Sequence, residues 1–285
     1  MKKILLAAVL ALAGCAETPP GSVKNEAASG VDRMYVIPCG ENQVKDLSRW
    51  TPGVNVGKPF AFANHCYLIR HAKGWMLWDS GNPDRLAELP NGLTNPQGTI
   101  TAFMKKPLAD SLKEIGVAPG DITHFAMSHS HGEHSGNANL FPGATLYIQQ
   151  AEYDALFGPE PLKHGFAPAD FERLRDAKTV KLTGDHDVFG DGSVLIKSAP
   201  GHTPGHQVLV VRLPKSGPVM LSGDMVHLVT SWEHRIAPSF NFDVPQSLRT
   251  IDAMKAYAAR NGVQLWVNHD REQHARIPKA PSSVQ

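Results

Sequence analysis

The heptapeptide Ser-His-Ser-His-Gly-Glu-His occupies residues 128–134 and holds the densest group of metal-competent side chains in the chain. Three imidazoles and a carboxylate this close together are not expected all to be buried in an apolar core, because each would need its own polar partner. A shared metal ion satisfies them together. Imidazole and carboxylate ligands without cysteine suit Zn²⁺, with Mn²⁺, Fe²⁺ or Co²⁺ as alternatives. The stretch therefore predicts a metal site.

Residues of the same kind recur along the chain just after apolar strand candidates. The pairs of strand end and polar residue are Met127 and His129, Ser198 and His202, Ser222 and Asp224, and Val267 and His269. Open α/β architectures place their ligands at strand ends on one edge of a sheet, where loops are held by a rigid scaffold. We therefore expect these four side chains to meet.

The bulk composition is that of an ordinary globular protein. The 285 residues are 42% hydrophobic and 19% charged, and the formal net charge is +1. This balance provides no long-range field that would attract a phosphate backbone, and no run of Lys and Arg marks a nucleic-acid groove. A nucleic-acid partner is therefore disfavoured, and a small-molecule substrate is expected.

The first residues have the pattern of an export signal. Lys2 and Lys3 precede an apolar run, residues 4–12, that is too short to span a bilayer. The Leu-Ala-Gly-Cys at residues 12–15 resembles the lipobox of bacterial lipoproteins, which implies cleavage before Cys15 and lipidation of that cysteine. Residues 1–15 are thus expected to be a lipoprotein signal peptide. Residues 16–30, rich in Pro, Gly, Ala and Ser, are expected to be a flexible tether.

Ala16 bears on the destination of the exported chain. By analogy with lipoprotein sorting, the absence of Asp after the lipidated cysteine favours the periplasmic face of the outer membrane. The alternative is a plain secretory peptide, which would leave the protein soluble in the periplasm or secreted.

Two further cysteines, Cys39 and Cys66, lie outside this signal. In an exported protein they could form a disulfide. We favour the other interpretation, two buried free thiols on neighbouring strands. Neither has the spacing of a metal site or of a nucleophile, so we expect no catalytic role.

Residues 31–285 alternate strands with helices and are expected to form one domain. The expected strands are 34–37, 60–69, 75–78, 122–127, 144–148, 193–198, 207–213, 219–222 and 263–267. The expected helices are 107–115, 150–157 and 245–261, the last of which ends at Gly262.

The sequence HSHGEH at residues 129–134 resembles the His-X-His-X-Asp-His signature of the metallo-β-lactamase superfamily. Later landmarks follow in the order of that family. Residues 199–206 (APGHTPGH) are similar to its third-histidine segment, 222–224 (SGD) to its bridging aspartate, and 268–270 (NHD) to its last histidine. Residues 78–81 (WDSG) resemble a strand-end motif that supports the site from behind. The resemblance implies a four-layer αββα sandwich.

The resemblance also implies a ligand set for two divalent ions, for which we expect Zn²⁺. One ion would be held by His129, His131 and His202. The other would be held by Glu133, His134 and His269, and Asp224 would bridge the two. Glu133 departs from the family pattern, which has Asp there. Its longer stem could ligate from a shifted backbone or swing away as a proton carrier, so a mononuclear enzyme is the alternative.

Two such ions imply a hydrolytic mechanism. Coordination lowers the pKa of water to about 7, and the resulting hydroxide would attack an electrophilic carbonyl. Asp224 or Glu133 would receive and return the proton. His227, three residues after Asp224, is expected to donate a hydrogen bond to the substrate carbonyl or leaving group, with a purely structural role as the alternative. His206 is expected to support the site without ligating.

Within the superfamily, the layout resembles the N-acyl homoserine lactonase group. The likeness lies in residues 34–40 (MYVIPCG), 64–69 (NHCYLI) and 238–243 (PSFNFD). It implies a quorum-quenching enzyme that opens a lactone ring. The alternatives are a metallo-β-lactamase or another ester or thioester hydrolase of the same fold, and, from a different class, a lipoprotein that binds metal without catalysis.

Overall fold

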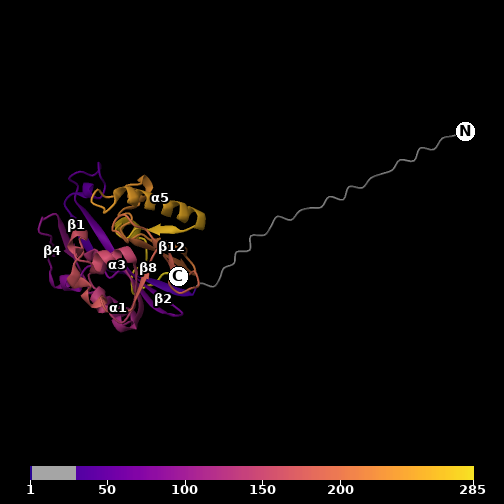
Figure 1. Cartoon of the computed structure of the whole chain (residues 1–285), viewed down its shortest axis with the longest axis horizontal. Coiled ribbons are helices and arrows are strands. Elements are labelled where there is room, and N and C mark those ends of the chain that lie inside the picture. Colours follow the sequence, from indigo (N-terminus) through magenta and orange to yellow (C-terminus); the bar gives the residue numbers. More distant parts are fainter. Residues whose placement is uncertain (2–29) are drawn as a thin grey trace.

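The computed structural model describes Met1 and residues 30–285 (Figure 1). The predicted signal peptide and tether fall within residues 2–29, apart from Met1 and Gly30, and so lie outside the described residues. Lipidation of Cys15 therefore stays a prediction. Among the described residues, no helix is both long and apolar enough to cross a membrane.

Two sheets form the centre of the described part of the chain. The larger has eight strands in the order β4-β5-β1-β2-β3-β6-β7-β8, and the smaller has five in the order β13-β12-β11-β10-β9. The strands of the larger sheet are β1 (Val31–Val44), β2 (Phe60–His71), β3 (Gly74–Trp78), β4 (Leu93–Thr94), β5 (Ile100–Phe103), β6 (Ile122–Ala126), β7 (Thr145–Gln149) and β8 (Thr179–Leu182). The strands of the smaller sheet are β9 (His186–Asp187), β10 (Val194–Ser198), β11 (Gln207–Leu213), β12 (Gly217–Leu221) and β13 (Gln264–Trp266).

The α-helices lie outside these sheets or in the loops at their ends. They are α1 (Leu108–Ile115), α2 (Gly132–Ser135), α3 (Gln150–Phe157), α4 (Val229–His234), α5 (Val244–Asn261) and α6 (Arg271–His274). Helix α5 begins where Asp243 accepts a hydrogen bond from the Gln246 backbone and ends at Gly262 in the left-handed conformation, as the sequence predicted.

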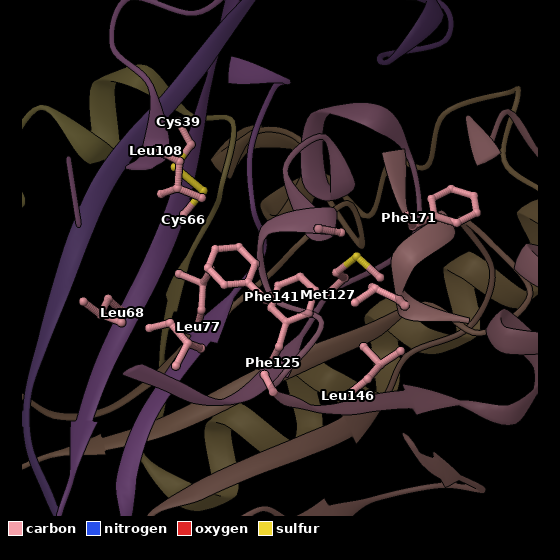
Figure 2. Close-up of a cluster of buried hydrophobic side chains, with 14 of the residues drawn as sticks. Cys39, Cys66, Leu68, Leu77, Leu108, Phe125, Met127, Phe141, Leu146 and Phe171 are labelled. Atoms are coloured by element: carbon pink, nitrogen blue, oxygen red, sulfur yellow. A yellow bond between two sulfur atoms is a disulfide. The ribbon is translucent and has the colours of Figure 1, made fainter. Parts of the chain in front are cut away.

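Three apolar clusters fill the spaces between the layers. Trp78 and Tyr67 of the larger sheet pack with Leu209 and Leu221 of the smaller sheet, so the two sheets lie face to face. On the outer side of the larger sheet, helices α1 and α3 cover Leu68, Leu77, Phe125 and Leu146 (Figure 2). On the outer side of the smaller sheet, Ile251 and Met254 of α5 pack on Val208, Val210 and Met220. This order of layers confirms the αββα sandwich.

The expected strands and helices are all present, but β1 is much longer than residues 34–37. It pairs with β2 along its whole length and also with β5 near its end. These neighbours supply ladder hydrogen bonds that keep the mixed sequence after Ile37 extended. The short strands β4, β5, β8 and β9 were not predicted from the sequence.

Cys39 and Cys66 are joined by a disulfide, with their Cα atoms 5.8 Å apart. The interpretation of two free thiols was therefore wrong. The cysteines lie on the antiparallel strands β1 and β2, and a register shift between Pro38 and Gly40 brings Cys39 next to Cys66. Both side chains are fully buried in the cluster under α1 (Figure 2).

The predicted strand ends do carry the polar residues, but they come from both sheets. His129 follows β6 of the larger sheet, whereas His202, Asp224 and His269 follow β10, β12 and β13 of the smaller one. The expectation of a single sheet edge was therefore too simple, because the site lies where the edges of two packed sheets meet.

Candidate metal centre

The loop after β6 presents three histidines because it turns at once into a one-turn helix. His131 occupies the position before α2, and His134 lies within it. Asp79, at the end of β3, fixes this loop. Its carboxylate accepts hydrogen bonds from the Ser128 backbone at 2.6 Å, from the Ser128 hydroxyl at 3.1 Å and from His134 Nδ1 at 2.9 Å. Asp79 has a φ of 58°, which is uncommon for a residue other than glycine, and backbone strain of this kind is often found at functional sites.

A first group of donor atoms comes from His129, His131, His202 and Asp224, and all four lie within 4.8 Å of one another. His131 Nδ1 lies 2.9 Å from His129 Nε2 and 3.1 Å from His202 Nε2. Asp224 Oδ2 faces the same point, 3.3 Å from His202 Nε2 and 3.8 Å from His129 Nε2.

A second group comes from His134, His269 and again Asp224. Here the other carboxylate oxygen takes part, since Asp224 Oδ1 lies 3.0 Å from His134 Nε2 and 2.8 Å from His269 Nε2. Asp224 therefore turns one oxygen to each group, which is the geometry expected of a bridging ligand.

Each histidine has one ring nitrogen that points away from the donor groups. The hydrogen bonds of these outer nitrogens show whether the residues suit metal ions. His131 Nε2 donates to the His164 carbonyl at 3.0 Å, and His202 Nδ1 donates to Asn241 Oδ1 at 2.8 Å. In the same way His269 Nδ1 donates to the Ala63 carbonyl at 2.7 Å, and His134 Nδ1 to Asp79.

A neutral imidazole whose outer nitrogen donates in this way keeps a lone pair on its inner nitrogen. The inner nitrogens of His131, His202 and His269 therefore face the donor groups as acceptors. Burial alone would lower the pKa of His134, but the carboxylates of Asp224 and Asp79 outweigh it and raise that pKa well above the ordinary value, so a proton takes the place of a cation at its Nε2, 3.0 Å from Asp224 Oδ1. Divalent cations would satisfy all of them, so the donor set fits.

Burial sets the protonation of the site. It lowers the pKa of His129 and of His202 well below the ordinary histidine value, which keeps both rings neutral and able to ligate. Burial by itself would raise the pKa of Asp224, but the surrounding histidines outweigh it and hold that pKa well below its usual range. The bridging carboxylate is therefore ionised.

Two buried residues, neither of them predicted from the sequence, connect the ligand loops. The Glu152 carboxylate of α3 accepts from the Ser130 backbone at 2.9 Å, from the Thr203 hydroxyl at 2.8 Å and from the Gly205 backbone at 3.0 Å. Asn241 orients His202 and donates to Ser247 at the start of α5. His206 supports the site without ligating, as predicted, because its Nε2 accepts from the Asp224 backbone at 2.9 Å.

His227 and Glu133 lie beside the donor groups, outside both of them. His227 Nε2 is 2.9 Å from Asp224 Oδ2, and its ring contacts Trp50 and Phe62. Glu133, predicted as a ligand of the second ion, is instead a half-buried residue in the wall of a neighbouring cavity. The structure thus brings together six of the seven predicted ligands and leaves Glu133 apart.

The cavity beside the donor groups has a volume of about 540 Å³. His227, His269 and Glu133 form part of its wall next to the metal ligands. Much of the remaining wall is apolar and comes from β1, β2, the β4–β5 hairpin and the loops after β1 and β3: Val44, Trp50, Phe62, Leu86, Leu93, Ile100 and Ala102. A cavity of this size and polarity suits a small molecule with an apolar portion and a polar head near the donor groups.

A family model described as the metallo-beta-lactamase superfamily matches residues 60–260, which is more than half of the chain. The chain belongs to the metallo-β-lactamase superfamily.

Curated relatives in this superfamily are named N-acyl homoserine lactonases. The chain is 32% identical over 258 residues to N-acyl homoserine lactonase AttM of Azorhizobium caulinodans, and the match covers 87% of this chain and 97% of that protein. It is 28% identical over 260 residues to N-acyl homoserine lactonase AiiA of Bacillus thuringiensis subsp. kurstaki, covering 89% of this chain and 99% of that one. The predicted likeness to this group of the superfamily is confirmed.

Solved structures of the superfamily agree. An N-acyl homoserine lactone hydrolase with the product N-hexanoyl-L-homoserine bound at its catalytic metal centre superposes with a TM-score of 0.79 at 26% identity. That match covers 89% of this chain and 99% of the other. The metallo-β-lactamase fold read from residues 129–134 is thereby confirmed over nearly all of the described domain.

Proposed function

We propose that this superfamily member is a metal-dependent hydrolase that opens the ring of N-acyl homoserine lactones and so quenches quorum-sensing signals. One observation carries the proposal: the two donor groups that share Asp224 lie beside an apolar-walled cavity of about 540 Å³. The relatives named as lactonases support the substrate class.

We propose Zn²⁺ as the native metal in both groups, since imidazole and carboxylate donors without thiolate suit it. Bound there, two divalent ions would supply Lewis acidity to the lactone carbonyl and make water a nucleophile at neutral pH.

The residues of the cavity would bind the substrate, transfer a proton and hydrogen-bond the reacting group. Trp50, Phe62 and Leu93 would bind the acyl chain and exclude water from it. The Glu133 carboxylate, in the cavity wall, would receive the proton of the attacking water and pass it to the alkoxide oxygen released when the ring C–O bond breaks. His227 would hydrogen-bond the substrate at the rim of the donor groups, where its Nε2 already lies beside Asp224.

Lactone hydrolysis tests the proposal directly. The full chain, reconstituted with Zn²⁺, would be given a long-chain N-acyl homoserine lactone while acid release is followed at constant pH. Rapid turnover that chelation abolishes, and that the His202→Asn variant lacks, is expected. Stoichiometric metal without turnover would refute the lactonase proposal, and panels of cephalosporins, esters and thioesters would then separate another hydrolase from a protein that only binds metal.

We also propose that the chain is a lipoprotein anchored through Cys15 at the periplasmic face of the outer membrane. The lipobox-like residues 12–15 support this, and so does the Cys39–Cys66 disulfide, because such bonds persist mainly in oxidising compartments. Metabolic labelling with a radioactive fatty acid should mark the wild-type chain in the outer-membrane fraction and leave Cys15→Ser unlabelled. Equal solubility of the two chains would refute the anchor.

A further inference from the structure

The two donor groups of the metal centre differ in how many protein ligands they offer. The first has four, His129, His131, His202 and Asp224, whereas the second has only His134 and His269 besides the shared Asp224. Protein sites that retain zinc as a structural element supply four ligands, and sites with three leave positions for solvent or substrate. The two groups should therefore hold their ions with unequal strength.

Glu133 is the residue that would make the two groups equal. It lies next to His134 in the one-turn helix α2, between two ligands of the centre. Its carboxylate is in neither donor group, although the donor atom of the adjacent His134 is.

The position of Glu133 in helix α2 explains why its carboxylate lies outside the second donor group. Side chains at adjacent positions of a helix point about 100° apart. A side chain next to His134 therefore reaches the same ion only if it has the length needed to bend back toward it. The Glu133 carboxylate is not among the donor atoms that lie within 4.8 Å of one another, and its charge acts on His227. It lines the cavity instead, together with His227 and His269.

We infer that Glu133 does not ligate, and that the second ion, held by His134, His269 and Asp224, binds more weakly than the first and is released before it. The inference rests on the proposal that two divalent ions bind here, but it does not depend on the substrate. The chain would then pass through a form with one ion when zinc is scarce, and the cavity side of the centre would empty first.

Metal binding can be measured without substrate. The full chain, stripped of metal by dialysis, would be titrated with Zn²⁺ against a chromophoric chelator, and bound zinc would be counted by mass spectrometry at each step. We expect two binding steps whose dissociation constants differ by at least about tenfold, since one site has four protein ligands and the other three.

Two variants separate the ligands from the cavity wall. His269→Asn should abolish the weaker step and keep the tighter one. Glu133→Gln keeps the shape of the side chain and removes its charge, and it should leave both dissociation constants within about threefold of wild type, well below the 10–100-fold loss typical even of residues that only support a ligand.

Opposite results would overturn the inference. A Glu133→Gln chain whose weaker step is lost or weakened tenfold would make Glu133 a ligand, and two equal steps in the wild type would remove the asymmetry. Because no turnover is measured, two unequal steps together with inactivity toward every lactone would refute the proposed function and leave this inference standing.

Discussion

At the scale of single residues, the centre depends on side chains that touch no ion but hold the ones that do. Asp79 contacts Ser128 and His134 at once, and its positive φ places it where most residues are disfavoured. Ligand orientation therefore rests on a few buried acceptors behind the histidines.

Asp79→Asn should weaken zinc binding in the group of His134 by about 10–100-fold, because an amide cannot accept all three hydrogen bonds. Asparagine tolerates the left-handed backbone, so the strand end should keep its shape. Chelator competition measures the effect. The control is Asp187→Asn, because Asp187 accepts hydrogen bonds from Gly190 and Gly192 of its own hairpin. Equal zinc affinity in the two variants would show that Asp79 does not orient His134.

His227→Phe keeps the aromatic packing against Trp50 and Phe62 and removes the nitrogen beside Asp224. If His227 hydrogen-bonds the reacting lactone, kcat should fall roughly 100-fold while KM and zinc content stay near wild type. Steady-state kinetics and metal analysis of one preparation distinguish loss of a substrate hydrogen bond from loss of metal. An unchanged kcat would assign His227 a structural role, the alternative that its sequence position left open.

The ligands themselves were predictable from sequence, because they are rare residues clustered in short motifs such as residues 129–134. Glu152 and Asn241 were not, since a glutamate on a helix and an asparagine in a loop have the pattern of surface residues. Their role arises from contacts between distant segments: Thr203 donates to Glu152 across 51 residues of sequence. Glu133 shows the limit of a motif, which places the residue in the loop but not the direction of its side chain.

At the scale of elements, helix α3 holds the two ligand loops together. Glu152 is fully buried and accepts one bond from the loop of His131 and two from the loop of His202. The helix therefore contributes to the geometry of the first donor group from outside the sheets.

Glu152→Gln replaces one accepting oxygen with a donor that would face backbone N–H groups. Leaving such buried groups unpaired should cost about 1–3 kcal/mol of unfolding free energy in the metal-free protein. Urea unfolding followed by circular dichroism gives the value. Glu172→Gln, an exposed change in the same region of the chain, should be neutral. Identical unfolding midpoints for the two variants would contradict a role for Glu152 in joining the loops.

Strand β2 and helix α6 meet through two buried histidines, whose rings stack with centroids 3.7 Å apart. Burial lowers the pKa of His65 to about 3 and depresses that of His274 as well. In the unfolded chain both would titrate near the ordinary value of about 6.5, so below that pH the unfolded chain binds more protons than the folded one. Stability should therefore be complete above pH 6.5 and fall as the pH drops toward 3.

The expected slope is about 1.4 kcal/mol per pH unit for each histidine. His274→Phe preserves a ring in the stack, so between pH 6 and pH 4 its unfolding free energy should fall less steeply than that of wild type by about that amount. Urea titrations of the metal-free proteins at several pH values measure the difference. If the unfolding free energy falls equally steeply with pH in the two chains, His274 does not have the lowered pKa expected of it.

Strands β4 and β5 could not be predicted from sequence for a physical reason. Strands β4 (Leu93–Thr94) and β5 (Ile100–Phe103) are too short to show a hydrophobic period. Strand β5 forms because β1 extends far enough to pair with it, and β4 pairs in turn with β5. Strands with buried apolar runs, such as β11, were predictable because packing between layers dictates their composition.

At the scale of the whole molecule, one covalent link ties β1 to β2 beneath helix α1. The double variant Cys39→Ala/Cys66→Ala removes a crosslink between residues 27 apart in sequence. Loop-closure entropy predicts a loss of about 3.5 kcal/mol of unfolding free energy. Chemical unfolding of both chains measures the loss, and a reductant should destabilise only the wild type. Full stability of the variant without the crosslink would contradict the estimate.

The long strand β1 also determines where the domain could be attached to a solid support without covering the cavity. Its first residue, Val31, lines a surface hollow together with Gly30 and Gln285, and its last, Val44, lines the cavity beside the metal ligands. Fourteen extended residues cover about 45 Å. The backbone bridge between Met34 and Val284 keeps the carboxyl end of the chain at the same remote side. A resin, filter or carrier protein coupled at either end of the domain would thus be attached about one strand length away from the cavity.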